Sequence, residues 1–235
     1  MMENPLPERY SIHKEKDTTI IYISAGKDLL NKIPLDGTIG SPSELRGRGK
    51  IYILDGNIVV RPLVHGGMLR AFMQDRFLIV KRSIRELKVS SYLISKGIPT
   101  PEVLAVRFIR KGIFYNICVI SVLVPDSIDL MTYLETTRLD SRDVIKKTGG
   151  LVRDIHGCGV FHSDLHIKNI LLDKDLNPWI LDLDKASRLA YMPPALKWLN
   201  IKRFFRSCKK WEKKGRIVLP SGWEVCFRQG YGARD

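Results

Sequence analysis

Three polar residues with oxygen-bearing side chains lie close together in the segment VFHSDLHIKNILLDKDLNPWILDLDKA, which covers residues 160–186. They are Asp164, Asn169 and Asp182, and apolar residues typical of β-strands surround them. Carboxylate and amide oxygens suit Mg²⁺, and a carboxylate can also accept a proton from a hydroxyl. The segment is therefore a candidate phosphoryl-transfer site, with Asp164 acting on the hydroxyl and Asn169 and Asp182 holding the metal ion.

A β-hairpin is expected to position these side chains. The runs ILL and WIL are strand-forming, and the polar segment DKDLNP between them indicates a turn. With the turn centred near Asp175 and Leu176, paired residues have numbers that sum to about 351, which places Asn169 opposite Asp182. Both side chains then emerge at one end of the hairpin, with Asp164 just upstream. The alternative is a chance hairpin in which these residues only cap turns.

The elements before this segment are mainly strands. Strand-forming runs occur at 18–24, 50–54, 57–61, 103–109 and 115–124, with Asp55 and Gly56 marking a tight hairpin turn. Helical spacing of apolar residues predicts one helix over 77–96, which Gly97 ends. From Asp126 onward the pattern becomes helical, at 127–135, 141–159 and 195–214. We therefore expect an α+β chain with a mainly antiparallel β lobe over 1–124 and a helical lobe over 125–235.

Composition excludes several classes of protein. The four cysteines have no metal-type spacing, which argues against a zinc site and a disulfide framework. The N-terminus lacks the apolar stretch of a signal peptide, and the longest apolar run, 113–124, is too short to span a bilayer of ~30 Å. The net charge of +14 leaves nucleic acid, anionic lipid and phosphorylated substrates as candidate partners.

The segment HSDLHIKN resembles the protein-kinase catalytic-loop pattern H-R-D-L-x-x-x-x-N, and DLD stands where D-F-G belongs. The resemblance implies a protein-kinase-like two-lobe fold, in which His162 supports the loop by hydrogen bonding rather than as a general acid or base. His156 and His166 carry no distinct signal, so we expect caps or surface residues there.

The upstream half fits the same pattern less closely. Gly47 and Gly49 precede a strand, where a Gly-rich loop could approach phosphates or simply form a turn. Arg61 stands where the kinase motif V-A-I-K has its lysine, and Glu86 on the following helix is the expected ion-pair partner of Arg61 or a solvated helix residue. The resemblance assigns these four residues to the binding of ATP.

Two residues in the candidate site depart from the protein-kinase pattern. Ser163 replaces an arginine through which many protein kinases read a phosphorylated loop, and Asp184 replaces the flexible glycine of D-F-G. Only 53 residues follow Asp182, which is too few for the peptide-docking subdomain of protein kinases. A small-molecule or lipid-linked hydroxyl is therefore the expected acceptor, at a constitutively assembled site.

Several longer stretches resemble the lipopolysaccharide kinase family, and within it the 3-deoxy-D-manno-octulosonic acid (Kdo) kinases. These stretches are GRGKIYIL, VVRPLVHGGMLRAF, SIRELKVSSYLISKGIPTPEVLA, GVFHSDLHIKNILLD, WILDLDKA and LNIKRFFRSCKKW. The resemblance implies phosphorylation of a Kdo hydroxyl on a lipid A precursor, with ATP and Mg²⁺ as cofactors. It also implies a peripheral enzyme at the cytoplasmic face of a Gram-negative inner membrane.

A basic amphipathic helix is expected near the C-terminus. Its predicted apolar face is formed by Trp198, Ile201, Phe205, Cys208 and Trp211, and residues 197–216 contain nine Lys and Arg and one Glu. The opposite face could bind an anionic membrane surface, at ~1 kcal/mol for each basic residue, or could simply be solvated. A second candidate anion-binding region, or merely the outer face of a helix, comprises Arg70, Arg76, Lys81, Arg82 and Arg85.

Three other functions remain as alternatives. One is a heptose kinase of the lipopolysaccharide core, another is a small atypical protein kinase, and the third is a non-catalytic nucleotide-binding module. The presence of Asp164, Asn169 and Asp182 together argues against the non-catalytic module. The absence of an RNA-type aromatic motif argues against nucleic acid, and no obligate protein partner is evident.

Overall fold

The computed structural model describes residues 6–24, 41–42, 51–63, 76–77, 80–137 and 140–232. These residues form two compact units. The first comprises the described residues up to Ser91 together with Glu102–Leu123, and the second comprises Tyr92–Pro101 and the described residues from Val124 onward. Tyr92–Pro101 thus groups with the second unit, although it precedes the predicted boundary at 124. Gly47 and Gly49 lie outside the described residues.

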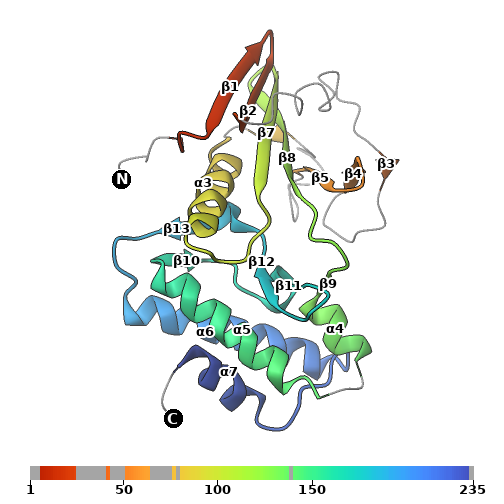
Figure 1. Ribbon diagram of the computed structural model, residues 1–235, viewed down its shortest axis with the longest axis vertical. Coiled ribbons are helices and arrows are strands. Elements are labelled where there is room, and N and C mark those ends of the chain that lie inside the picture. The colour runs from red at the N-terminus through yellow and green to blue at the C-terminus, as the bar shows by residue number, and fades with distance from the viewer. Residues whose placement is uncertain are drawn as a thin grey trace. The chain divides into compact units, whose positions relative to one another are not determined.

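The described residues of the first unit form one antiparallel sheet of eight strands. Seven of them follow the order β1-β2-β7-β8-β5-β4-β3 (Figure 1), and β6 pairs with β8. The strands are β1 (Tyr10–Glu15), β2 (Thr18–Ile23), β3 (Ser41–Pro42), β4 (Tyr52–Leu54), β5 (Ile58–Pro62), β6 (Arg76–Phe77), β7 (Val103–Lys111) and β8 (Phe114–Val122). The antiparallel sheet expected from the strand-forming runs is therefore confirmed.

Tight turns explain why neighbouring strands of this sheet pair antiparallel. Asp55 and Gly56, between β4 and β5, have φ angles of 53° and 72°, as a type I′ hairpin turn requires. Gly112, between β7 and β8, has φ 64°. Strand β1 was not predicted, because its sequence YSIHKE is mostly exposed and shows little apolar alternation.

Helix α3 (Lys81–Ser95) covers one face of the sheet (Figure 1). Its fully buried Leu87 packs in a core cluster with sheet side chains that include Val106 and Val119. The helix confirms the one predicted over 77–96, and it ends before Gly97, whose φ of 72° breaks the helical geometry. The exposed side chains of Lys81, Arg82 and Arg85 lie on this helix, whereas Arg70 lies outside the described residues.

The second unit combines helices with short strands. Its helices are α4 (Leu130–Thr136), α5 (Arg142–Gly157), α6 (Pro194–Lys213) and α7 (Trp223–Tyr231), with short 3₁₀ helices η2 (Ile167–Asn169) and η3 (Leu183–Lys185). Its strands are β9 (Ile128–Asp129), β10 (Val160–His162), β11 (Ile170–Leu172), β12 (Pro178–Ile180) and β13 (Ala186–Arg188). They form a β12-β11-β9 sheet and a separate β10-β13 pair. Together with the sheet of the first unit, these helices confirm the predicted α+β class.

Helix α7 was not predicted, and it determines how α6 packs. Phe204 of α6 stacks on Phe227 of α7 with ring centroids 5.1 Å apart, and Phe205 meets Trp223 edge-on at 4.9 Å. The predicted apolar face of α6 is therefore wrong at one end, because Trp198 is 58% exposed while Phe204 is buried. No helix among the described residues is both long and apolar enough to span a membrane.

Candidate active site

The hairpin β11–β12 carries the segment with the predicted site, but its register differs by one residue from the prediction. Ile170 pairs with Ile180, and the N–H of Leu181 donates to the carbonyl of Asn169 at 2.9 Å, so Asn169 lies opposite Leu181 rather than Asp182. The reason is the turn. The Asp173 carboxylate accepts hydrogen bonds from the backbone N–H groups of Asp175 and Asn177.

This arrangement makes a turn with three residues between Asp173 and Asn177, whose backbones are hydrogen-bonded at 3.1 Å. Leu176, the last residue of the turn, has φ 57°, as a three-residue hairpin loop requires. An odd number of loop residues centres the turn on Asp175. Asp173 is the sequence signal that could have predicted this turn, because Asp side chains commonly accept hydrogen bonds from backbone N–H groups two residues ahead.

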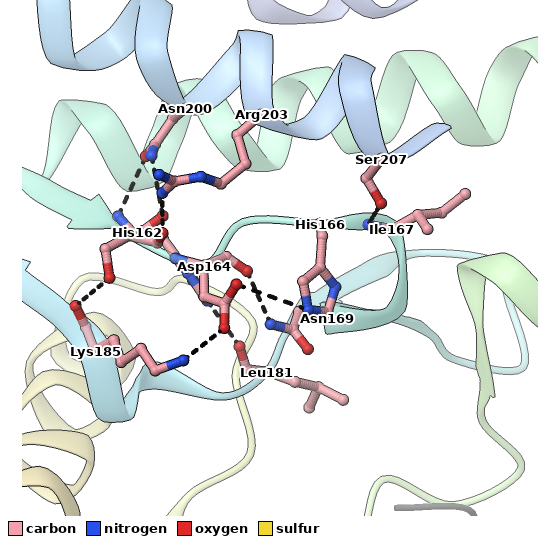
Figure 2. A network of polar contacts seen from close by, with 11 residues as sticks. His162, Asp164, His166, Ile167, Asn169, Leu181, Lys185, Asn200, Arg203 and Ser207 are labelled. Carbon is pink, nitrogen blue, oxygen red and sulfur yellow. Dashed lines mark hydrogen bonds and ion pairs between the residues drawn. The ribbon is translucent and has the colours of Figure 1, made fainter. Parts of the chain in front are cut away.

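Asn169 and Asp182 nevertheless emerge at the same end of the hairpin. The Asn169 Nδ2 donates to the carbonyl of Asp164 at 3.0 Å, which fixes the amide so that its Oδ1 is directed elsewhere (Figure 2). Asp182 follows directly after the residue opposite Asn169, with φ 60° and ψ 59°. This left-handed conformation costs a non-glycine residue about 1–2 kcal/mol. Such strain is commonly found at functional sites.

His162 holds together the loop of residues 162–169, which matches the kinase catalytic-loop pattern, by hydrogen bonding as predicted. Its Nε2 bonds to the carbonyl of Leu181 at 2.9 Å, and its Nδ1 accepts from the N–H of Asp164 at 3.2 Å. These bonds define the tautomer, because Nε2 must donate to a carbonyl while Nδ1 accepts. Burial lowers the pKa of His162 although the Leu181 carbonyl and nearby carboxylates oppose this effect. The ring is therefore a neutral link between the loop and the hairpin.

A second buried histidine supports the same loop, contrary to the prediction of a surface or capping role for His156. Asn200 of α6 accepts from the N–H of His162 at 3.2 Å and donates to its carbonyl at 3.0 Å (Figure 2). The same Asn200 oxygen bonds His156 Nε2 at 3.1 Å, and His156 Nδ1 bonds the Tyr231 hydroxyl at 2.8 Å. Helix α6 thus bonds the backbone of His162 directly, and α5 and α7 are linked to it through Asn200.

The carboxylate of Asp164 is paired with Lys185, whose Nζ lies 2.9 Å from Oδ2. Burial alone would raise the pKa of Asp164, but the hydrogen bond and charge of Lys185 outweigh it and hold the pKa below its ordinary value. The other oxygen, Oδ1, has His166 Nε2 at 4.0 Å, beyond hydrogen-bond distance. Because the Asp164 carboxylate is ionised, its Oδ1 can accept a hydrogen bond from a hydroxyl.

Ser163 has a structural partner in place of the one that an arginine would have in protein kinases. Its Oγ donates to the carbonyl of Lys185 at 2.8 Å. Its own carbonyl contacts the guanidinium of Arg203 on α6. Sequence reasoning missed Lys185, Asn200 and Arg203, because no local pattern marks residues that act from a distant helix or from beyond the hairpin.

In the first unit, Arg61 on β5 and Glu86 on α3 form the expected ion pair, with Nη2 2.5 Å from Oε1. The Glu86 side chain is 9% exposed and that of Arg61 is 32% exposed. Glu86 is therefore a buried partner of the arginine rather than a solvated helix residue. The function of this pair in nucleotide binding stays a prediction, as does that of Gly47 and Gly49.

The oxygen donors fit Mg²⁺ rather than a metal bound entirely by protein. Among the residues that the structure describes, no three His, Cys, Asp or Glu side chains gather closely enough to hold a metal ion. One carboxylate and one oriented amide, Asp182 and Asn169, lie at the hairpin end. Mg²⁺ commonly uses one or two such ligands and completes its shell with water and substrate phosphates.

The α+β fold and the loop that carries Asp164 are those of a kinase-like enzyme. Such an enzyme transfers a phosphoryl group from ATP to a hydroxyl. Residues 39–217 match the family model described as the lipopolysaccharide kinase (Kdo/WaaP) family, and the chain belongs to that family. It therefore acts in lipopolysaccharide biosynthesis.

Three similar proteins share one name. A 3-deoxy-D-manno-octulosonic acid kinase of Xylella fastidiosa strain M23 is 30% identical over 184 residues, which cover 74% of this chain and 72% of that protein. The kinase of the same name from Xanthomonas euvesicatoria pv. vesicatoria is 29% identical over 220 residues, or 83% of each chain. That from Vibrio parahaemolyticus is 29% identical and covers 74% of this chain and 78% of that protein.

Proposed function

We propose that this enzyme phosphorylates a hydroxyl of Kdo on a lipid A precursor, with ATP as donor and Mg²⁺ as cofactor. The observation that carries the proposal is the Asp164 carboxylate, held beside Asn169 by the network of His162 and Asn200, in a chain of this family. The names of the similar proteins support Kdo as the acceptor sugar.

In the proposed reaction, Asp164 orients the sugar hydroxyl and accepts its proton as the transfer proceeds. The hydroxyl oxygen forms a bond to the γ-phosphorus of ATP, while the bond between that phosphorus and the β–γ bridging oxygen breaks and its electron pair leaves with ADP. Asn169 and Asp182 would hold the Mg²⁺, which when bound neutralises charge between the phosphates. Arg61, fixed by Glu86, and the backbone at Gly47 and Gly49 would bind the phosphates.

We also propose that the enzyme binds reversibly to the cytoplasmic face of the inner membrane, where its lipid acceptor lies. Support comes from α6, on which Trp198, Lys202 and Arg206 are exposed one turn apart. The Lys202 ammonium lies 4.4 Å from the Trp198 ring centroid. An exposed tryptophan beside a lysine is suited to the boundary between anionic headgroups and acyl chains.

The test is mass spectrometry of the acceptor after incubation of the purified protein with ATP, Mg²⁺ and Kdo-bearing lipid A precursor. We expect a mass gain of one phosphate on the sugar. The matched negative control is Asp164→Ala, which should bind nucleotide but transfer nothing. Lipid A precursor without Kdo should remain unmodified. Modification of that Kdo-free lipid, or wild-type turnover by Asp164→Ala, would contradict the proposal.

A further inference from the structure

The ion pair between Asp164 and Lys185 joins two parts of the site that are 21 residues apart in sequence. Lys185 lies at the end of η3, three residues beyond Asp182, and thus belongs to the far side of the hairpin rather than to the loop that carries Asp164. The Asp164 side chain is 25% exposed and that of Lys185 is 36% exposed. The pair is therefore partly shielded from water but open to a substrate.

Lys185 is held at its backbone as well as at its ammonium group. The hydroxyl of Ser163 donates to the Lys185 carbonyl at 2.8 Å, so the adjacent residues Ser163 and Asp164 both bond to one lysine. Immediately afterwards, β13 begins with Ala186 paired to His162 of β10. Fixing both ends of a long flexible side chain reduces the conformational entropy that the ion pair would otherwise cost.

This geometry determines which carboxylate oxygen is left for the acceptor. Lys185 occupies Oδ2 at 2.9 Å, while the polar contact of Oδ1 is His166 at 4.0 Å. A carboxylate that accepts a proton from an attacking hydroxyl must present one oxygen at hydrogen-bond distance and in a defined orientation. An ammonium group bonded to the second oxygen supplies that orientation.

We propose that Lys185 is a positioning residue for the phosphoryl transfer, which holds Asp164 so that Oδ1 faces the acceptor hydroxyl, and that Ser163 anchors Lys185 for this purpose. The inference rests on the proposed function only in taking Asp164 as the residue that receives the hydroxyl proton. It explains a serine at the position where protein kinases carry arginine. Here residue 163 orders the lysine of the site instead of reading a phosphorylated loop.

The experiment compares Lys185→Met, which removes the charge but keeps the length of the side chain, with Lys185→Arg, which keeps the charge. We expect Lys185→Met to lower kcat by about 100-fold, the lower end of general acid–base contributions, with the KM for ATP and acceptor changed less than threefold. Lys185→Arg should recover at least a tenth of wild-type kcat. Ser163→Ala should lower kcat by about tenfold, again with little effect on KM.

The matched control is Lys174→Met, at an exposed lysine in the β11–β12 turn, which should match the wild type. Wild-type kcat in Lys185→Met would overturn the inference, as would an increase in KM that accounts for the whole loss. If Lys185→Met fails to fold, the kcat of Ser163→Ala decides, and a wild-type value there would also overturn it.

A second readout separates this inference from the proposed acceptor. ATP hydrolysis uses water as the attacking hydroxyl, so we expect the same ranking of the variants in that reaction. If the wild type hydrolyses ATP but does not phosphorylate Kdo, the proposed acceptor is wrong while the kcat ranking still tests Lys185. If the wild type does neither, the proposed function and this inference are both wrong.

Discussion

At the residue scale, different interactions orient the side chains of Asp164 and Asn169 and the backbone of Asp182. Asp164 is oriented by its backbone bond to His162 and by Lys185, whereas the Asn169 amide is fixed by the Asp164 carbonyl. Asp164 is bonded at Oδ2 and Asn169 at Nδ2, so in each side chain the other oxygen, Oδ1, points away from that bond. Asp182 differs, because its left-handed backbone at φ 60° turns the chain out of the strand.

Because of that conformation, Asp182→Asn can test metal binding without a change in the backbone. Asn tolerates the left-handed region about as well as Asp, so folding should be unchanged while the proposed Mg²⁺ ligand loses its charge. We expect the Mg²⁺ concentration for half-maximal activity to rise by about tenfold or more. A titration of activity with Mg²⁺ checks this, with Asp175→Asn in the exposed turn as the control. Equal Mg²⁺ requirements in the two variants would remove Asp182 from the metal site.

At the scale of elements, the catalytic loop depends on how α7 docks on α5. The two helices approach so closely that a Cβ added at Gly230 would lie 1.8 Å from the carbonyl oxygen of Lys146, and one at Gly149 would lie 2.1 Å from that of Phe227. Only hydrogen atoms fit at these positions. The contact brings Tyr231 to His156, and through Asn200 it reaches the backbone of His162.

Substitution at this crossing should destabilise the second unit. In a free helix, Gly230→Ala would be favourable by about 1 kcal/mol, but the clash with the Lys146 backbone should outweigh this gain and destabilise the fold by about 1–3 kcal/mol. The control is Gly157→Ala at the end of α5, where no atom lies within 4 Å of an added Cβ. The midpoint of urea unfolding should fall for Gly230→Ala and not for Gly157→Ala; similar midpoints would contradict the close packing.

The same network predicts how stability depends on pH. Burial lowers the pKa of His156 to about 4, with the bond to Asn200 opposing and the charge of Lys197 adding to the effect. Because the folded pKa lies below the unfolded value of about 6.5, the stability that His156 contributes is complete above pH 6.5. It is lost as pH falls toward 4, by roughly 3 kcal/mol in total.

Urea unfolding of the wild type and of His156→Gln between pH 7 and pH 4 measures this contribution. The free energy of unfolding of the wild type should fall more steeply in that window, and the difference between the two proteins isolates His156 from other groups, including His162. Parallel pH profiles would show that His156 does not titrate as a buried neutral ring.

At the scale of the whole molecule, the net charge is +14, and residues 197–216 alone contribute nine Lys and Arg and one Glu. Helix α6 presents Lys202 and Arg206 to solvent beside the exposed Trp198, while its basic neighbours are partly neutralised by ion pairs such as Lys209 with Glu224 at 2.7 Å. Electrostatic attraction to an anionic leaflet weakens as salt screens it. Co-sedimentation with vesicles should therefore require anionic lipid and decrease as salt is raised.

A charge reversal tests whether α6 carries the proposed membrane binding. Lys202→Glu should weaken vesicle binding by roughly 30-fold, since each charge near the leaflet is worth ~1 kcal/mol and the reversal changes the charge by two. Lys174→Glu makes the same change in charge in the β11–β12 turn and should have a smaller effect. Equal losses in the two variants would show that net charge, rather than this helix, holds the enzyme to the lipid.

The sequence by itself determined the α+β class, most of the longer elements and the segment in which the candidate site residues lie. Asp164, Asn169 and Asp182 fall within 19 consecutive residues, and the turns at Asp55–Gly56 and Gly112 are local, so the conformational preferences of a few neighbouring residues specify them. Only the tertiary structure decided the one-residue register of the hairpin, the buried face of α6 and the partners of the catalytic loop. The physical reason is that Lys185, Asn200 and His156 act through hydrogen bonds across the fold. Those bonds depend on how helices and strands pack, which sequence spacing does not encode.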